Sequence, residues 1–322
     1  MDLFAKNIGV PFTEIEAFET GVGGSPSNIA IGTSRLGLKS ALLTAVGPDE
    51  VGKFVIENLK QEGVETQFIQ QKPDTRTGMA VVGVQPPDKF PLVFYRENPA
   101  DVHLTIDDVL NLPLDKAKAL LLSGTAMSRG SCRDATLFAA EYGKQQGTTN
   151  FIDLDLRPDQ WTHGRGFGLN IRTLLPYLDV VIGTEEEFFA ALAPDPQTPM
   201  SGQSLNESEL QALMQHIEDL LKHSHSPETL VLKRGARGVS IFTKSSEPFD
   251  VAGYEIEVLN TVGAGDAFAS GLIYGFMHGW PWQNCAKMAN ACGAIVVTRH
   301  GCSTAMPIEK EVLAFIDTHG GF

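Results

Sequence analysis

A glycine-rich segment that leads into an apolar helix constrains this sequence more than any other feature. The segment reads Asn260-Thr261-Val262-Gly263-Ala264-Gly265-Asp266, and apolar residues then recur at helical spacing from Phe268 to Phe276. Glycine adopts backbone conformations that side chains forbid, so Gly263 and Gly265 favour a tight turn. The spacing predicts a helix that begins near Gly265 or Asp266. The N–H groups and positive dipole at that end of the helix would bind an anion such as phosphate.

Asp266 adds an acid to this predicted anion site. In phosphoryl transfer, backbone donors stabilise the charge on the transferred group, while a carboxylate accepts the proton of the attacking hydroxyl. The alternative interpretation is that Asp266 is only an acidic residue at a helix N-terminus and that the glycines form an ordinary turn. Spacing alone does not choose between the two interpretations.

A second glycine motif, Gly23-Gly24-Ser25-Pro26-Ser27-Asn28, lies far upstream of the first. In this order, the two motifs resemble the signatures of the PfkB/ribokinase family of sugar kinases. The resemblance extends over essentially the whole chain, from Asp2 to Pro307. It implies a carbohydrate kinase that uses ATP and Mg²⁺.

The resemblance also implies roles for individual residues of this chain. Asp266 would be the catalytic base, with the amides of Gly263, Ala264 and Gly265 as the anion hole. The residues expected to bind the sugar are Asp2, Gly23, Gly24, Asn28, Arg96 and Arg157. The residues expected near the nucleotide are Lys233, Gly235, Gly238 and Asn290. Glu186 would bind the ATP magnesium through water, which suits an ion that keeps most of its hydration shell.

Several of these positions have a structural explanation as well. Asn28 could serve as a capping group at the turn before its helix. Thr184-x-x-Glu187 is a capping box, which explains the surrounding acidic cluster without any metal. Arg96 could be an ordinary surface arginine.

Three positions depart from the family pattern, and one is Gly183, which stands where the family has an Asn three residues before the Glu that matches Glu186. Relatives begin with a buried strand that precedes the residue matching Asp2, and no residues here match that strand, so Asp2 is expected to be weakly anchored. Asn260 stands where many relatives have an Asp that helps to bind a monovalent cation such as potassium. A neutral amide is a weaker cation ligand than a carboxylate, which argues against a dependence on potassium.

Two arginines are the main indication of the substrate class. The stretch 153–158, which ends in Arg157-Pro158, resembles a sequence of the 2-keto-3-deoxygluconate kinases, in which this arginine and another after an aromatic pair bind the sugar acid. Arg96 follows Phe94-Tyr95 and supplies the second. The planar fork of arginine binds both oxygens of a carboxylate. A sugar acid is therefore expected as the substrate.

Within the family, the Gly-Gly-Ser-Pro variant and the stretches 86–96 and 182–187 most resemble the branch that phosphorylates 5-dehydro-2-deoxygluconate in inositol breakdown. The alternatives are a 2-dehydro-3-deoxygluconokinase and a fructokinase-like kinase of a neutral sugar. An interpretation from another class is a non-catalytic regulator that binds a sugar or nucleotide, because a fold does not determine a function.

Strands and helices alternate along the chain, which predicts parallel β-α-β units. Apolar strands are expected at 41–47, 119–124, 180–183, 230–233 and 239–242, and a strand with its exit loop is expected at 151–158. Helices are expected at 26–36, 50–63, 136–147, 210–222 and 286–297. The expected fold is a ribokinase-like α/β three-layer sandwich with a mostly parallel central sheet, formed by residues 1–322 as one domain. Residues 14–22 and 76–100, with a hairpin turn at Pro86-Pro87-Asp88, would form a small β-sheet lid and a homodimer contact.

Composition limits the partners and the compartment. The net charge of −14 argues against nucleic acid and anionic membranes, since both attract basic patches. No apolar stretch approaches the ~18 residues of a membrane span. The four cysteines form no C-x-x-C pair and fit a reduced, cytoplasmic protein without structural zinc.

Overall fold

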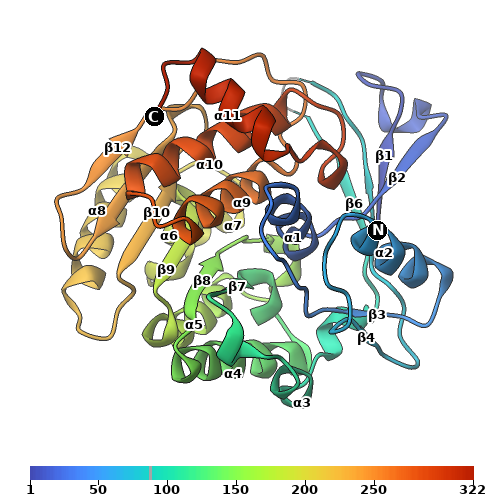
Figure 1. Cartoon of the computed structure of the whole chain (residues 1–322), viewed down its shortest axis with the longest axis horizontal. Helices are drawn as coiled ribbons and strands as arrows, with labels where there is room; N and C mark the ends of the chain where they lie inside the picture. The colour runs from blue at the N-terminus through green and yellow to red at the C-terminus, as the bar shows by residue number, and fades with distance from the viewer. Residues whose placement is uncertain (87–88) are drawn as a thin grey trace. The chain divides into compact units, whose positions relative to one another are not determined.

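The computed structural model describes residues 1–86 and 89–322 and contains two compact units (Figure 1). The first unit comprises Met1–Leu104 and Gly253–Phe322, and the second comprises Thr105–Ala252. Two residues of the predicted Pro86-Pro87-Asp88 turn lie outside the described residues. Among the residues described, no helix is both long and apolar enough to cross a membrane.

The second unit is built on a six-stranded sheet with the order β12-β11-β10-β9-β8-β7. The strands are β7 Ala119–Ser123, β8 Thr149–Asp153, β9 Val180–Thr184, β10 Thr229–Lys233, β11 Val239–Thr243 and β12 Phe249–Val251. Strands β7 to β10 are parallel to one another, and β11 and β12 continue the sheet in antiparallel fashion. The mostly parallel sheet was predicted, because its central strands are continuous apolar runs that are buried on both faces.

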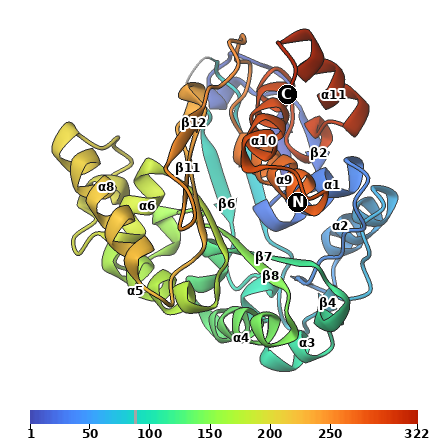
Figure 2. The same ribbon diagram turned by 60° about the vertical axis from the view of Figure 1, so that its left-hand side comes forward.

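Helices flank this sheet (Figure 2). They are α3 Ile106–Leu110, α4 Gly130–Gln146, α5 Gly164–Leu174, α6 Glu185–Leu192, α7 Gln197–Met200 and α8 Glu207–Lys222. Helix α4 packs on β7 and β8, and α6 packs on β9 and β10 and contacts α5 and α8. Helix α4 ends where predicted, at Gly147, whose φ of 79° is the left-handed conformation that glycine adopts most easily. Helix α5 was missed by the sequence analysis.

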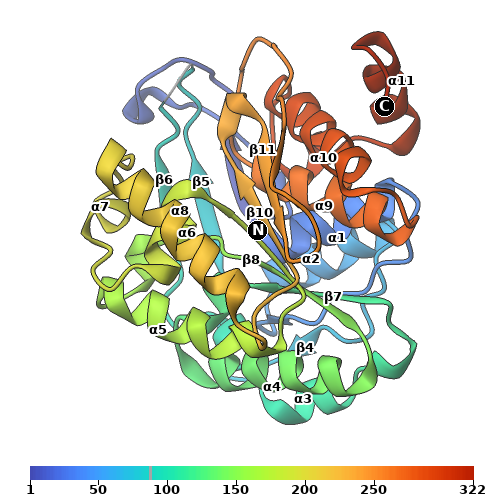
Figure 3. The same cartoon turned by 90° about the vertical axis from the view of Figure 1, so that its left-hand side faces the viewer.

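The first unit contains a helical layer, shown from the side in Figure 3. Its helices are α1 Ser25–Arg35, α2 Glu50–Gln61, α9 Ala264–Met277, α10 Trp282–Val297 and α11 Glu309–Thr318. Helix α9 packs against both α1 and α10. A Cβ at Gly271 would lie 2.8 Å from Met288 O, so glycine lets the backbones of α9 and α10 approach closely. On α1, a Cβ at Gly32 would overlap the side chain of Ser270 on α9.

A four-stranded sheet with the order β2-β1-β5-β6 completes the first unit. Its strands are β1 Asp2–Ala5, β2 Phe18–Gly21, β5 Met79–Val82 and β6 Leu92–Tyr95. The hairpin of β5 and β6 was predicted. The prediction that Asp2 is weakly anchored was wrong, because Asp2 pairs with Gly21 on one side and with Ala80 on the other.

The strand predicted at 41–47 is reduced to β3, Ala45–Val46, which pairs with the equally short β4, Gln70–Gln71. One further bridge joins Ala41 to Glu65. The apolar sequence at 41–47 was not sufficient for a longer strand, because β4 pairs with only two of its residues.

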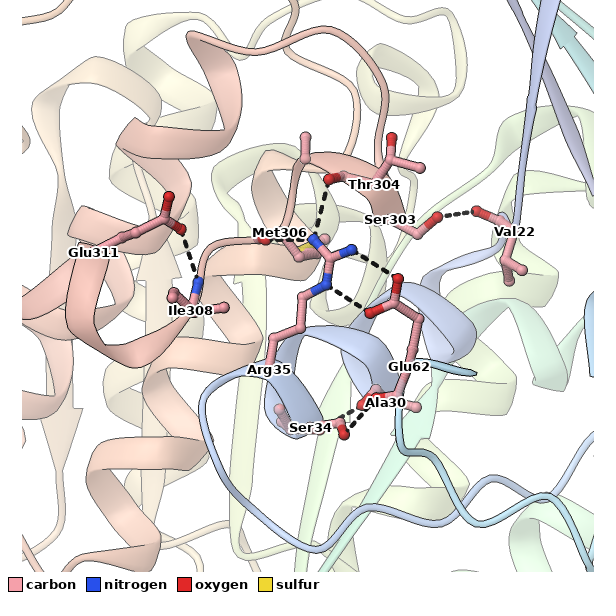
Figure 4. A network of polar contacts seen from close by, with 12 residues as sticks. Val22, Ala30, Ser34, Arg35, Glu62, Ser303, Thr304, Met306, Ile308 and Glu311 are labelled. Atoms are coloured by element: carbon pink, nitrogen blue, oxygen red, sulfur yellow. Dashed lines mark hydrogen bonds and ion pairs between the residues drawn. The ribbon is translucent and has the colours of Figure 1, made fainter. Parts of the chain in front are cut away.

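An arginine links three separate segments of the first unit (Figure 4). Arg35 Nε and Nη2 each donate to a carboxylate oxygen of Glu62 at 2.7 Å. Arg35 Nη1 donates to Thr304 O at 3.0 Å and to Met306 O at 2.7 Å. The guanidinium therefore fixes the segment 303–306 to α1 and to the end of α2.

We expect Arg35→Met to lower the free energy of unfolding by about 1–3 kcal/mol, because a part-buried carboxylate and two carbonyls lose a charged donor. Urea denaturation measures this change. Lys53→Met removes an exposed ion pair with Glu50, 2.6 Å in length, and should change stability by less than about 1 kcal/mol. Equal effects of the two substitutions would contradict the structural role of Arg35.

Candidate active site

The predicted glycine-rich turn and its helix are present in the first unit. Gly263 caps α9 with a φ of 86°, and a Cβ there would overlap Cys302 Sγ. The helix begins at Ala264, slightly earlier than predicted, and this places Asp266 in its first turn. The first N–H groups of a helix have no acceptor within the helix itself. Of the predicted anion-hole amides, that of Ala264 donates to Thr261 O at 3.2 Å.

Asp266 is half-buried and is contacted through its Oδ2 by two other side chains. Asn28 Nδ2, from α1, donates to Oδ2 at 2.7 Å across 238 residues of sequence. Cys302 Sγ makes a long, weak contact with the same oxygen at 3.9 Å. Asn28 and Asp266 were each predicted separately and lie together in the structure. Cys302 was missed, because no motif in the sequence distinguishes it from the other cysteines.

Asn260 is fully buried and uses both ends of its side-chain amide. Its Nδ2 donates to Gly301 O at 3.0 Å, and its Oδ1 accepts from Val262 N–H at 3.0 Å. An ionised carboxylate could accept from Val262 but could not donate to Gly301 O. The amide therefore joins the turn before α9 to the loop that carries Cys302.

The other first-unit residues predicted to bind sugar lie at the ends of strands and helices. The carboxylate of Asp2 lies against Gly23, where a Cβ would overlap it. Gly24 caps α1 with a φ of 88°. Arg96 follows β6, and its Nη2 lies 2.5 Å from Asp101 Oδ2. A side chain at Gly23 would thus displace Asp2.

In the second unit, a buried ionic cluster lies where β8, β9 and β10 end. Lys233 Nζ lies 3.0 Å from Asp153 Oδ1 and 3.8 Å from Glu187 Oε2. Burial raises the pKa of Asp153 above its ordinary value, and the Lys233 ammonium opposes this effect. Burial also acts to lower the pKa of Lys233, but the two carboxylates outweigh it and raise that pKa. Lys233 therefore stays protonated and serves as an internal counter-ion.

Glu187 makes more contacts than the capping role that the sequence predicted. The predicted capping box is present, with Glu187 N–H donating to Thr184 Oγ1 at 3.2 Å and Thr184 N–H donating to Glu187 Oε2 at 2.7 Å. Glu187 Oε1 also accepts from Leu156 N–H at 3.2 Å, which links α6 to the exit of β8. Glu186 is half-buried on the same turn. The sequence did not predict the contact between Glu187 and Leu156, because the capping box already explained why a glutamate stands at position 187.

Arg157 lies on the exit loop of β8, with its Nη2 2.9 Å from Asp155 Oδ1. Asp155 has a φ of 36°, which is uncommon for a residue other than glycine. Burial raises the pKa of Asp155, and the Arg157 guanidinium opposes the shift. Arg157 therefore already has an anionic neighbour.

The remaining residues predicted near the nucleotide are divided between the units. Gly235, with a φ of 57°, begins a short 3₁₀ turn between β10 and β11 in the second unit, and Gly238, with a φ of 88°, caps its end. Asn290 is buried on α10 in the first unit. Within the described part of the chain, no group of three or more His, Cys, Asp or Glu side chains could hold a metal ion.

Comparison with known proteins decides the family. The model of the pfkB family of carbohydrate kinases matches residues 2–309. The chain belongs to the PfkB family. This PfkB protein is also 34% identical, over 98% of its length and 90% of the relative's, to a protein of Geobacillus thermodenitrificans named 5-dehydro-2-deoxygluconokinase.

Solved structures agree with the ribokinase-like fold. A fructokinase from Vibrio cholerae O395 in a fructose-, ADP- and calcium-bound form is 26% identical, with a TM-score of 0.79 and coverage of 98% and 95% of the two chains. A sugar kinase from Pyrococcus horikoshii in complex with ATP is 25% identical, with a TM-score of 0.75 and coverage of 97% and 94%. The present PfkB protein is thus a phosphotransferase that acts on a sugar.

Proposed function

We propose that this kinase uses ATP to phosphorylate the primary hydroxyl of a sugar acid, 5-dehydro-2-deoxygluconate. The observation that carries the catalytic part is the Asp266 carboxylate, which Asn28 contacts at 2.7 Å in the first turn of α9. The substrate part is supported by the name of a relative that is 34% identical over nearly the whole chain. A role in inositol catabolism fits the name of the same relative.

In this mechanism Asp266 accepts the proton of the attacking hydroxyl while the hydroxyl oxygen forms a bond to the γ-phosphorus. The bond from that phosphorus to the bridging oxygen breaks, and ADP leaves with the electron pair. The N–H groups at Gly263 and Gly265 stabilise the charge on the transferred group, because they lie at the positive end of the α9 dipole.

Magnesium fits the acidic turn at the start of α6. This ion is usually held by one or two carboxylates, by water and by substrate phosphates, so a dedicated cluster of protein ligands is not required. Glu186 would bind its water shell, and the ion would neutralise phosphate charge. Lys233, Gly235, Gly238 and Asn290 would contact the nucleotide.

Arg96 and Arg157 would bind the carboxylate of the sugar acid, and Asp2, Gly23, Gly24 and Asn28 would contact its hydroxyls. Two related activities remain as alternatives. A 2-dehydro-3-deoxygluconokinase would also need the arginines, whereas a fructokinase-like enzyme would not. A regulator that binds ligands without catalysis would not need the base.

The four-stranded sheet supports a homodimer through the lid. Its exposed face carries apolar side chains, including Val93 and Tyr95, which are two residues apart on β6 and are 41% and 61% exposed. Its opposite face is buried around Phe4, Ala80 and Val82. An apolar face of this kind commonly marks a contact between proteins.

We expect Asp266→Asn to reduce kcat by about 10²–10⁴-fold, because an amide cannot accept the proton, and to leave nucleotide affinity unchanged. ADP release from Mg-ATP with 5-dehydro-2-deoxygluconate, and nucleotide titration, measure the two quantities. Asp219→Asn, an exposed change on α8, is the control. Unchanged turnover in Asp266→Asn would exclude this carboxylate as the base.

Arg96→Lys and Arg157→Lys should each raise the KM for the sugar acid about tenfold or more, because lysine keeps the charge but loses the planar fork. The KM for ATP should stay constant. Steady-state kinetics with the sugar acid and with fructose make the comparison, and Arg133→Lys on the exposed side of α4 is the control. Unaltered sugar-acid KM values in both variants would favour a neutral substrate.

Val93→Lys should convert a dimer into a monomer, because it places a charge in the proposed apolar contact. Sedimentation velocity measures the mass, and Leu169→Lys introduces the same charge at a 60% exposed position on α5 as a control. A monomeric unsubstituted protein would contradict the dimer.

A further inference from the structure

Asn28 has a different environment at each end of its side-chain amide. Its Nδ2 donates to Asp266 Oδ2, whereas its Oδ1 is buried and has no hydrogen-bond partner among the described residues. The assignment of the two ends follows from chemistry, since an ionised carboxylate can only accept. A buried acceptor without a donor is unfavourable, so the arrangement points to a donor that a ligand supplies.

A second polar atom without a partner lies on the same turn of α1. Ser25 Oγ is buried and has no hydrogen-bond partner within the described part of the chain. Ser25 and Asn28 are three residues apart, so they lie on the same side of the helix. Gly24, with its φ of 88°, is the N-cap of the helix and directly precedes Ser25. The start of α1 therefore offers two oxygen atoms to hydroxyl groups next to the proposed base.

Cys302 contacts the same oxygen of Asp266 from another segment. Its thiol lies 3.9 Å from Oδ2 and is itself almost fully buried. The preceding residue, Gly301, is held by Asn260, and the following residue, Ser303, donates from Oγ to Val22 O at 2.6 Å. Figure 4 shows that the segment after Cys302 is fixed further by Arg35.

We propose that Asn28 is a positioning residue that couples sugar binding to the orientation of the base, with Cys302 as a second restraint. Asn28 Oδ1 accepts a hydrogen bond from a sugar hydroxyl, and Nδ2 holds Asp266 Oδ2. When the sugar hydroxyl binds, it fixes the orientation of the Asn28 amide. The amide in turn fixes the orientation of the Asp266 carboxylate. This inference rests on the proposed role of Asp266 as the base.

The substitution Asn28→Asp separates the two contacts. It keeps an acceptor for the sugar hydroxyl but replaces the donor to Asp266 with a second carboxylate. A hydrogen-bond donor lowers the pKa of an ionised carboxylate, and a like charge raises it. Asp266 should therefore hold its proton to higher pH in this variant.

We expect Asn28→Asp to lower kcat at pH 7 by about 100-fold, to shift the acidic limb of kcat against pH upward by at least about one unit, and to change the sugar KM by less than about threefold. Asn28→Leu, which removes both contacts, should raise the sugar KM as well. Asn111→Asp, at an exposed position of the second unit, adds the same charge and should change none of the three quantities.

A second comparison uses the thiol. Cys302→Ala should lower kcat about three- to tenfold without a change in KM, and Cys302→Ser, which restores a donor, should recover part of the loss. Cys292→Ala removes an equally buried thiol from α10 and should retain full kcat. Thermal melting of each variant establishes which of them fold.

A wild-type acidic limb and kcat in folded Asn28→Asp would overturn the coupling. If that variant does not fold, Asn28→Leu decides, and a wild-type kcat and sugar KM in folded Asn28→Leu would overturn it. Equal kcat values for Cys302→Ala and the unsubstituted enzyme would exclude Cys302 as the second restraint. Turnover retained by Asp266→Asn is a separate outcome, because it would remove the base itself whatever the Asn28 variants show.

Discussion

The buried amide of Asn260 is the constraint on which the glycine-rich turn before α9 depends. It donates to Gly301 O and accepts from Val262 N–H, so two loops about 40 residues apart in sequence are held by one side chain. Those loops carry Gly263 and Cys302, whose close packing allows no side chain on the glycine. The Nδ2 atom that faces Gly301 is a donor and therefore no ligand for a cation. The weak potassium dependence expected from the sequence stays a prediction, and this geometry supports it.

Small residues bring helices α1 and α9 of the first unit close enough for Asn28 to contact Asp266. A Cβ on Gly32 would overlap the side chain of Ser270, so α1 lies directly on α9. Asn28 is one turn earlier on α1 than Gly32, and Asp266 is one turn earlier on α9 than Ser270. The 2.7 Å contact between Asn28 and Asp266 thus follows from the packing of two helices, and it does not depend on a flexible loop.

The parts of the fold that were predicted are those whose signals are local. The turn before α9, the β5–β6 hairpin and the apolar parallel strands are each encoded by neighbouring residues. The anchoring of Asp2 was predicted wrongly because it depends on pairing with strands that lie elsewhere in the sequence. Cys302 and the second contact of Glu187 were missed for the same reason, since only the folded chain brings them to their partners.

The ion pairs of the two arginines bear on how a sugar acid could be selected by so acidic a protein. Arg96 lies 2.5 Å from Asp101, and Arg157 lies 2.9 Å from Asp155. To bind either arginine, a substrate carboxylate would therefore have to replace the aspartate that is already paired with it. The part-exposed pair of Arg96 and Asp101 contributes only about 0–1 kcal/mol, so exchange there costs little, whereas Asp155 is buried and its displacement from Arg157 costs more. A two-point contact between a substrate carboxylate and the guanidinium fork would offset this cost. Under this exchange, a neutral sugar would gain nothing from displacing either aspartate, and the internal pairs would favour an acid.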